Sequence, residues 1–302
     1  MSVKINHLTK VYGSQKAVND VSLMVNKGDI LGFLGPNGAG KSTTMKIMAC
    51  YLPQTSGDVE VCGHDVIDNP MDVRKKVGYL PEHNPLYDEM YVKEYLAFVA
   101  GIHKLENKRQ RVAEMIEMTG LQIEQKKRIG ELSKGYRQRV GLAQAMIHDP
   151  EVLILDEPTT GLDPNQIVEI RNLIKQLGEE KTVILSSHIL HEVEAICNRI
   201  VIINHGKLVA NDKTQNLNQS MNNKTVLLVE FDKKASIEDL QKIKGVIKAI
   251  VKGPMQYEIH ANTKTDVRPA ISKFAATNNM SILALQKQTV NLENIFQELT
   301  NK

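Results

Sequence analysis

The stretch GPNGAGKST, from Gly35 to Thr43, decides the fold class of this chain. It fits the phosphate-loop pattern G-x-x-x-x-G-K-[ST], follows the strand-like run DILGFL and precedes the helical run MKIMACYL. Glycines let backbone N–H groups turn inward on phosphates, and the start of the following helix adds its positive dipole end. A glycine-rich turn that binds nothing is the alternative, but the strand–loop–helix context favours a nucleotide phosphate site.

Every residue of this loop is a candidate contact to the nucleotide. Lys41 is expected to reach the β- and γ-phosphates and to take part in catalysis, and the Ser42 hydroxyl is expected to bind Mg²⁺. The pattern therefore predicts a nucleoside triphosphate and Mg²⁺ as ligands. The full candidate set is Gly35, Pro36, Asn37, Gly38, Ala39, Gly40, Lys41, Ser42 and Thr43.

The stretch VLILDEP, from Val152 to Pro158, supplies two acids at the end of an apolar run. An apolar run of this kind is typical of a strand buried on both faces. Asp156 is expected to hold Mg²⁺ through water, and Glu157 is expected to polarise the water that attacks the γ-phosphate. A pair of surface acids is the alternative, and the presence of the glycine loop favours the catalytic interpretation.

Two further candidates rest on weaker signals. His188 follows the run KTVILSS, at the strand end where ligands gather in open α/β sheets, and is a candidate contact to the γ-phosphate. A lone histidine there is more often a helix cap or a packed residue. Tyr12 could stack on a purine, although an aromatic residue in an edge strand usually serves packing.

Strand-like and helical patterns alternate from Ile30 to Val209, which predicts an α/β domain with a largely parallel sheet. The runs VKINHL and VSLMV alternate in polarity and predict antiparallel edge strands. Two helices, VKEYLAFVAGIHK and ENKRQRVAEMIEMTG, predict a helical insert at about residues 90–150. The strand runs are DILGFLG, DVEVCG, VGYLP, EVLILDE, KTVILSS and RIVIINHG.

A polar stretch without periodicity, NDKTQNLNQSMNN, divides the chain into two predicted domains. Residues 1–210 are predicted to form the first domain, which contains the phosphate loop, and residues 211–223 the linker. Residues 224–302 follow a β-α-β-β-α-β-α order, with a last helix at NLENIFQELT, which predicts a ferredoxin-like α+β module. This module carries no cluster of catalytic residue types, so a regulatory or accessory role is expected.

Composition limits the possible partners. The length of 302 residues agrees with about two domains, and the net charge of +3 gives no argument for nucleic acid or an anionic membrane. Three scattered cysteines are typical of a reduced compartment. The start lacks an apolar signal segment, and no apolar run is long enough to span a bilayer, so a membrane role is expected to come through a partner.

One stretch, LSKGYRQR, looks like a phosphate-binding helix start without a phosphate of its own. A Ser-x-Gly turn, formed by Ser133, Lys134 and Gly135, precedes an arginine-rich helix far along the chain from the glycine loop. The residues alone leave open which phosphate this turn binds.

Together these stretches resemble the ATP-binding subunits of ABC transporters over residues 2–210. Seven motifs occur in the family's order: Tyr12 at the adenine-stacking position, GPNGAGKST as Walker A, YLPE ending in Glu82 as the Q-loop, LSKGYRQR as the signature, VLILDE as Walker B, TGLD ending in Asp163 as the D-loop, and His188 as the switch histidine. GYLPEHNPLY, NLENIFQELT and the C-terminal module resemble the exporter-type subgroup. Within it, the overall similarity is greatest to gliding-motility-associated members.

The resemblance implies an ATPase that drives a separate transmembrane permease from the cytoplasmic face of the plasma (inner) membrane. It also implies a head-to-tail dimer, expected to be a homodimer, in which Ser133, Lys134 and Gly135 close over the partner's ATP. Two departures stand out. Glu82, a candidate Mg²⁺ ligand, replaces the usual glutamine and adds a negative charge beside the γ-phosphate. Lys134 replaces the first signature glycine, and Tyr136 replaces the usual signature glutamine.

The alternative class is a soluble ABC-type ATPase that acts on DNA or ribosomes without a permease. DNA-repair members carry a coiled coil or a zinc module between the Q-loop and the signature, whereas residues 82–132 hold only a short helical insert without zinc-ligand spacing. Translation-linked members carry two cassettes, and this chain has one. No nucleic-acid partner is therefore expected. A nucleotide-binding regulator without turnover is disfavoured by Glu157.

Overall fold

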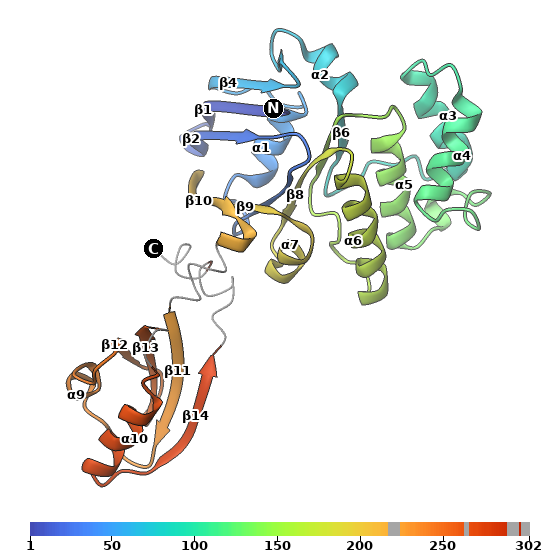
Figure 1. Cartoon of the computed structure of the whole chain (residues 1–302). Coiled ribbons are helices and arrows are strands. Elements are labelled where there is room, and N and C mark those ends of the chain that lie inside the picture. The colour runs from blue at the N-terminus through green and yellow to red at the C-terminus, as the bar shows by residue number, and fades with distance from the viewer. Residues whose placement is uncertain (217–223, 263–265, 289–295, 297–302) are drawn as a thin grey trace. The chain divides into compact units, whose positions relative to one another are not determined.

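The computed structural model describes residues 1–216, 224–262, 266–288 and 296. The chain divides into two compact units, Met1–Lys213 and Thr214–Asn301, each with its own sheets and core (Figure 1). The last predicted helix, NLENIFQELT, lies outside the described residues apart from Phe296. No helix in the described ranges has both the length and the apolar character required to cross a membrane.

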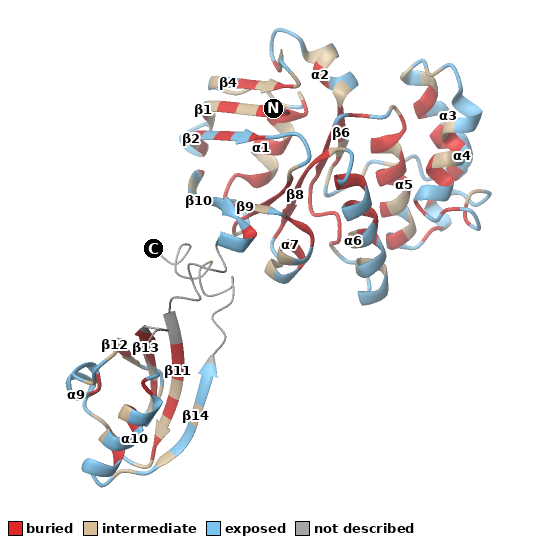
Figure 2. Ribbon diagram, in the orientation of Figure 1, coloured by how far each residue is buried: buried red, intermediate tan, exposed pale blue. Residues whose placement is uncertain are grey.

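The first unit is built on a six-stranded, mostly parallel sheet. The strands β3, β7 and β8 are buried along their whole length, as strands inside a parallel sheet should be (Figure 2). β3 and β7 are apolar throughout, whereas β8 is apolar in its centre. β10 pairs antiparallel with β9 and forms one edge. In order across the sheet, the strands are β10 (Lys207–Lys213), β9 (Arg199–Asn204), β3 (Ile30–Leu34), β8 (Thr182–Ser187), β7 (Val152–Leu155) and β6 (Val77–Leu80).

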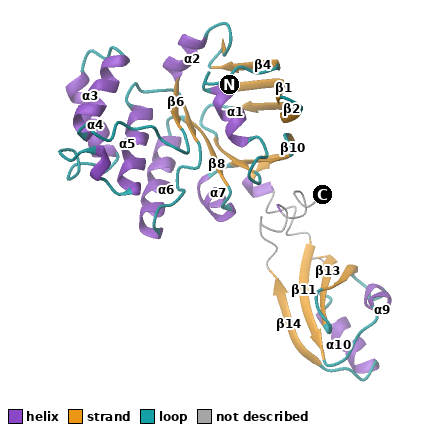
Figure 3. Ribbon diagram, turned by 180° about the vertical axis from the view of Figure 1, so that it is seen from behind, coloured by secondary structure: helices purple, strands orange, loops and turns teal. Residues whose placement is uncertain are grey.

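Helices cover both faces of this sheet. Leu31 and Phe33 of β3 share a core with the helix α1 (Lys41–Met48), whereas a side chain on Gly32 would collide with Val193 of α7 (Leu190–Ile196). The amphipathic helix α6 (Pro164–Gly178) packs against β8 (Figure 3). The short helix α2 (Pro70–Lys76) directly precedes β6.

The antiparallel strands expected at the N-terminus form a sheet of their own, which differs from the expectation of an edge on the parallel sheet. Its order is β2 (Gln15–Val25), β1 (Val3–Tyr12), β4 (Ser56–Val61) and β5 (His64–Asp65). The run DVEVCG, which was expected among the strands of the parallel sheet, supplies β4. The reason is visible in its pattern, because Val59 and Val61 are buried while their neighbours are not, as in a strand with one face in the core.

The two helices predicted for the insert are confirmed as α3 (Val92–Ile102) and α4 (Lys108–Met118). A 3₁₀ turn (Ile129–Glu131) leads into the long helix α5 (Lys134–Met146). The Tyr95 hydroxyl donates a 2.7 Å hydrogen bond to the Gln144 side chain, which ties α3 to α5.

The second unit has a four-stranded antiparallel sheet in the order β12-β13-β11-β14. This is the order of a split β-α-β motif and agrees with the ferredoxin-like expectation. Its core lies between the sheet and two helices. The elements are β11 (Lys224–Phe231), α9 (Ile237–Gln241), β12 (Val246–Val251), β13 (Gln256–Asn262), α10 (Arg268–Thr277) and β14 (Ile282–Gln288).

Candidate functional site

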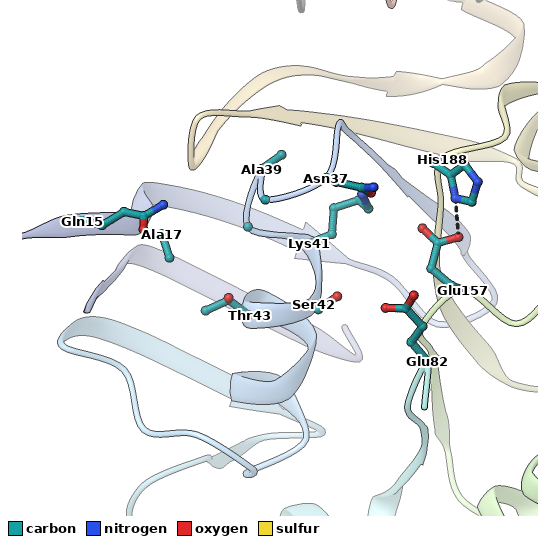
Figure 4. Close-up of a pocket in the computed structure, with 12 residues that line it drawn as sticks. Gln15, Ala17, Asn37, Ala39, Lys41, Ser42, Thr43, Glu82, Glu157 and His188 are labelled. Carbon is teal, nitrogen blue, oxygen red and sulfur yellow. Dashed lines mark hydrogen bonds and ion pairs between the residues drawn. The ribbon is translucent and has the colours of Figure 1, made fainter. Parts of the chain in front are cut away.

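A cavity of about 450 Å³ lies over the start of α1, at the carboxyl end of β3. The glycine loop forms one wall, the hairpin between β1 and β2 another, and acidic and histidine side chains the third (Figure 4). Its lining residues are Gln15, Ala17, Asn37, Gly38, Ala39, Gly40, Lys41, Ser42, Thr43, Glu82, Glu157 and His188.

The loop between β3 and α1 depends on glycine at specific positions. Gly40 has a φ of 109°, and a side chain there would collide with the backbone oxygen of Ala17. A side chain on Gly35 would collide with the oxygen of Ile203. Gly40 begins α1 without a side-chain cap, so the first N–H groups of the helix are available to an anion in the cavity.

Lys41 is buried and its ammonium group folds back onto the loop. It donates to the carbonyl oxygens of Gly35 at 2.7 Å and Pro36 at 3.3 Å. Burial lowers the pKa of Lys41, and the carboxylates of Glu157, Asp156 and Glu82 oppose that shift. Lys41 therefore lies within electrostatic reach of all three acids.

Asp156 ends the buried strand β7 and is itself almost fully buried. Its Oδ1 accepts hydrogen bonds from the Ser42 hydroxyl at 3.1 Å and the Ser186 hydroxyl at 2.6 Å. The glycine loop and the acidic strand end therefore meet in one place. Ser186, at the end of β8, also accepts from the backbone N–H of Glu157 at 2.9 Å, and sequence reasoning did not single it out.

Glu157 lies directly beside Asp156 with an unusual backbone. Its φ of 52° is in the left-handed region that non-glycine residues rarely occupy, and strain of this kind clusters at functional sites. The His188 Nδ1 lies 2.9 Å from its Oε2, and the Thr160 hydroxyl donates to the same oxygen at 3.2 Å. The carboxylate is thus held by two side chains while it faces the cavity (Figure 4).

The structure separates the remaining candidates into two groups. Glu82 is exposed and lines the cavity on the same side as Glu157, facing Lys41 and Ser42 (Figure 4). Tyr12 does not line it, although the neighbouring hairpin residues Gln15 and Ala17 do, and the Lys10 ammonium lies 5.2 Å from the Tyr12 ring centre. Gln15 and Ala17 were missed because nothing in their residue types distinguishes them from ordinary hairpin residues.

The Ser-x-Gly turn lies away from this cavity. The Ser133 side chain caps α5 by accepting from the N–H of Tyr136 at 3.4 Å, and a side chain on Gly135 would collide with Gln166 of α6. Asp163 caps α6 through the N–H of Gln166 at 2.9 Å. The predicted signature and D-loop are therefore packed together, and neither lines the cavity of its own subunit.

A phosphate-binding loop, a buried Asp–Glu pair and a histidine at adjacent strand ends define a P-loop ATPase cassette. The sequence profile of the family described as "ABC transporter" matches residues 18–160. The bacitracin transport ATP-binding protein BcrA of Bacillus licheniformis is 41% identical over 76% of this chain and 78% of its own length. The linearmycin resistance ATP-binding protein LnrL of Bacillus subtilis is 32% identical over 99% of this chain and 98% of its own.

Solved structures agree with this family. A dimeric ATP-binding cassette, captured after hydrolysis with ADP and phosphate, matches with a TM-score of 0.65 and 26% identity over 70% of this chain and 98% of that one. The chain belongs to the family of ABC transporter ATP-binding proteins. It is an ATPase subunit that binds ATP and works with a separate permease.

Proposed function

We propose that the cavity binds ATP with its phosphates on the start of α1 and hydrolyses it with Glu157 as general base. The observation that carries this proposal is the convergence of the uncapped glycine loop with Asp156 and Glu157. Lys41 would exchange its loop carbonyls for the β- and γ-phosphates. The predicted contacts of the other loop residues, and of Tyr12 with the base, complete the nucleotide site.

Mg²⁺ fits the oxygen donors of this site. Among the described residues, no cluster of three or more His, Cys, Asp or Glu side chains could hold a metal on its own. Mg²⁺ prefers oxygen ligands and usually binds through one or two carboxylates together with substrate phosphates. Ser42, Asp156 and Glu82 would hold it, and the ion would neutralise charge on the β- and γ-phosphates.

In the reaction, Glu157 would accept a proton from water as the water oxygen bonds to the γ-phosphorus and the bond to the β–γ bridging oxygen breaks. The products are ADP and phosphate. His188, which already contacts the Glu157 carboxylate, would orient that base and face the γ-phosphate.

The active unit is proposed to be a dimer of identical chains with two shared sites. Ser133, Lys134 and Gly135 of one chain, with Asp163 nearby, would close over the ATP of the other. Two observations support this. The turn lies outside its own cavity, and a similar cassette has been solved as a dimer.

The permease is proposed to dock on the helical insert, which places the chain at the cytoplasmic face of the plasma membrane. Large apolar side chains are exposed there, after Glu82, and Tyr87 contacts Phe98 with ring centres 5.9 Å apart. An exposed apolar patch is typical of a protein contact. The exposed members are Tyr87, Tyr91, Phe98 and Ile102.

We further propose that the transporter is an exporter, because two similar proteins are named for bacitracin transport and linearmycin resistance. The resemblance to gliding-motility members stays a prediction. Residues 1–210 would be the motor, 211–223 the linker and 224–302 a regulatory module. A permease-free role on DNA or ribosomes remains the alternative, and co-purification with a membrane protein separates the two.

Mixing two inactive variants tests the shared site. Lys41→Ala removes a phosphate contact and Ser133→Ala a signature hydroxyl, so either homodimer should lose nearly all single-turnover hydrolysis. A mixed dimer regains one intact site. When one chain carries both changes and its partner is wild type, one site of the mixed dimer lacks Lys41 and the other lacks the Ser133 hydroxyl. Neither site of that mixed dimer is then intact. If mixed dimers form but the single variants do not complement each other, the turn does not act on the partner's site.

A further inference from the structure

Two exposed residues, Glu82 and Lys134, carry opposite charges. Neither takes part in an ion pair or side-chain hydrogen bond within the described part of the chain. Opposite charges of this kind can pair with each other when two chains meet.

The cavity carries an excess of negative charge before any nucleotide enters. Glu157 and Glu82 line the cavity, the buried Asp156 lies within electrostatic reach of Lys41, and Lys41 is the one lysine or arginine among the residues that line the cavity. ATP adds more negative charge than Mg²⁺ removes. Glu82 therefore adds negative charge beside the γ-phosphate that Mg²⁺ offsets only in part, and no lysine or arginine of the cavity lining other than Lys41 offsets the remainder.

Lys134 is a cation held at the start of α5, directly beside Ser133. Its side chain extends over Gly161 in the predicted D-loop, where any side chain would collide with the Lys134 ammonium. A side chain on Gly135 would likewise collide with the Gln166 side chain. The Lys134 ammonium therefore lies beside the predicted D-loop, on the turn that is proposed to meet the partner's ATP.

We infer that Lys134 forms an ion pair with Glu82 of the partner subunit across the shared ATP site, so that the two residues select and close the dimer together. This inference rests on the proposed function, because it requires the signature to act on the partner's site. A carboxylate has two oxygens, so Glu82 can face Mg²⁺ and Lys134 at once. Close charge pairs at interfaces contribute specificity as well as affinity.

The pairing makes an unusual prediction for mixed dimers. A Glu82→Gln chain and a Lys134→Gln chain each form homodimers in which every site has one unpaired charge. In their mixed dimer, one site has both charges and the other has neither. Mixed dimers should therefore be favoured. When both changes are in one chain and the partner is wild type, every site of the mixed dimer is mismatched, and homodimers should be favoured.

The experiment measures dimer composition by native mass spectrometry, with ATP and Mg²⁺ present and Glu157→Gln in every chain to slow hydrolysis. Differently tagged chains are mixed in equal amounts. We expect the mixed dimer to exceed its statistical share for the two single variants and to fall below it for the double variant with wild type. Lys134→Gln should weaken ATP-dependent dimerisation by about tenfold when Glu82 is present and by much less beside Gln at position 82.

Two control variants distinguish the effect of the charge at position 134 from other effects of substitution. Lys134→Arg should behave as wild type, and Lys126→Gln, at an exposed lysine of the insert without an ion-pair partner among described residues, should leave the dimer distribution statistical. If ATP-dependent dimers form but mixed dimers have their statistical share in both mixtures, the ion pair is overturned and the proposal of a shared ATP site is unaffected. Absence of any ATP-dependent dimer would overturn the shared site itself.

Discussion

At the scale of single residues, Gly40 shows how closely the backbone constrains the nucleotide site. Its φ of 109° and its proximity to the Ala17 oxygen leave no room for a side chain. Gly40→Ala should abolish measurable ATP binding, because the start of α1 must move, and should lower the free energy of unfolding by about 1–3 kcal/mol. Fluorescent-nucleotide titration and urea unfolding measure the two effects.

Gly63→Ala is the matched control. Gly63 has a φ of 80° but no atom within 4 Å of an added side chain, and it does not line the cavity. It should share the loss of stability and retain ATP binding. Equal nucleotide affinity in the Gly40 variant would show that the loop does not form the site described here.

A second residue-scale prediction concerns pH. His148 stacks on His103 with ring centres 4.0 Å apart, and burial, with a smaller contribution from His103, lowers the pKa of His148 to about 4. Arg111 also lowers this pKa, whereas Asp149 and the hydrogen bond to the Val77 oxygen raise it. The folded state therefore binds a proton less readily than the unfolded chain.

The stabilisation from neutral His148 is complete above the unfolded pKa and decreases as pH falls from about 6.5 towards 4. We expect a loss of about 2 kcal/mol in the free energy of unfolding between pH 7 and pH 5 that His148→Gln removes. Urea unfolding at the two pH values measures it. His191→Gln, at an exposed position, should leave the loss unchanged, and a wild-type loss that persists in His148→Gln would contradict the assignment.

At the scale of elements, the helical insert carries the proposed permease contact. Phe98 of α3 is 44% exposed and lies in the aromatic cluster with Tyr87. Phe98→Asp places a charge in that patch and should prevent co-purification with the permease while ATP binding is unaffected, because α1 and the cavity are untouched. Ile123→Asp is the control, since Ile123 is 84% exposed on the same insert outside this cluster. Undiminished capture of the permease by the Phe98 variant would place the contact elsewhere.

The elements also show what sequence could predict. The apolar runs of β3 and β7 and the apolar centre of β8 predicted the parallel sheet, because burial on both faces leaves a strong pattern, and the phosphate-loop motif predicted the loop after β3. The place of β4 was not predicted, because an alternating run indicates a half-buried strand without naming its sheet. Ser186 and Gln15 entered the site through long-range packing, which no local pattern encodes.

At the scale of the whole molecule, the first unit contains every predicted ATP-site residue, and the chain after Lys213 forms a separate unit with its own core. A chain that ends at residue 220 should therefore fold and bind ATP with wild-type affinity, as measured by circular dichroism and nucleotide titration. A folded truncated chain that no longer binds ATP would assign part of the nucleotide site to the C-terminal module.

The central claim is that Glu157 activates water in a site shared by two chains, and one variant tests it directly. Glu157→Gln keeps the shape of the side chain and its approach to His188 and Thr160 but removes the base. We expect ATP binding to persist, hydrolysis to slow by about 10²–10⁴-fold, and an ATP-bound dimer to accumulate on size exclusion with light scattering. Hydrolysis near the wild-type rate, with the protein monomeric in ATP, would contradict the account.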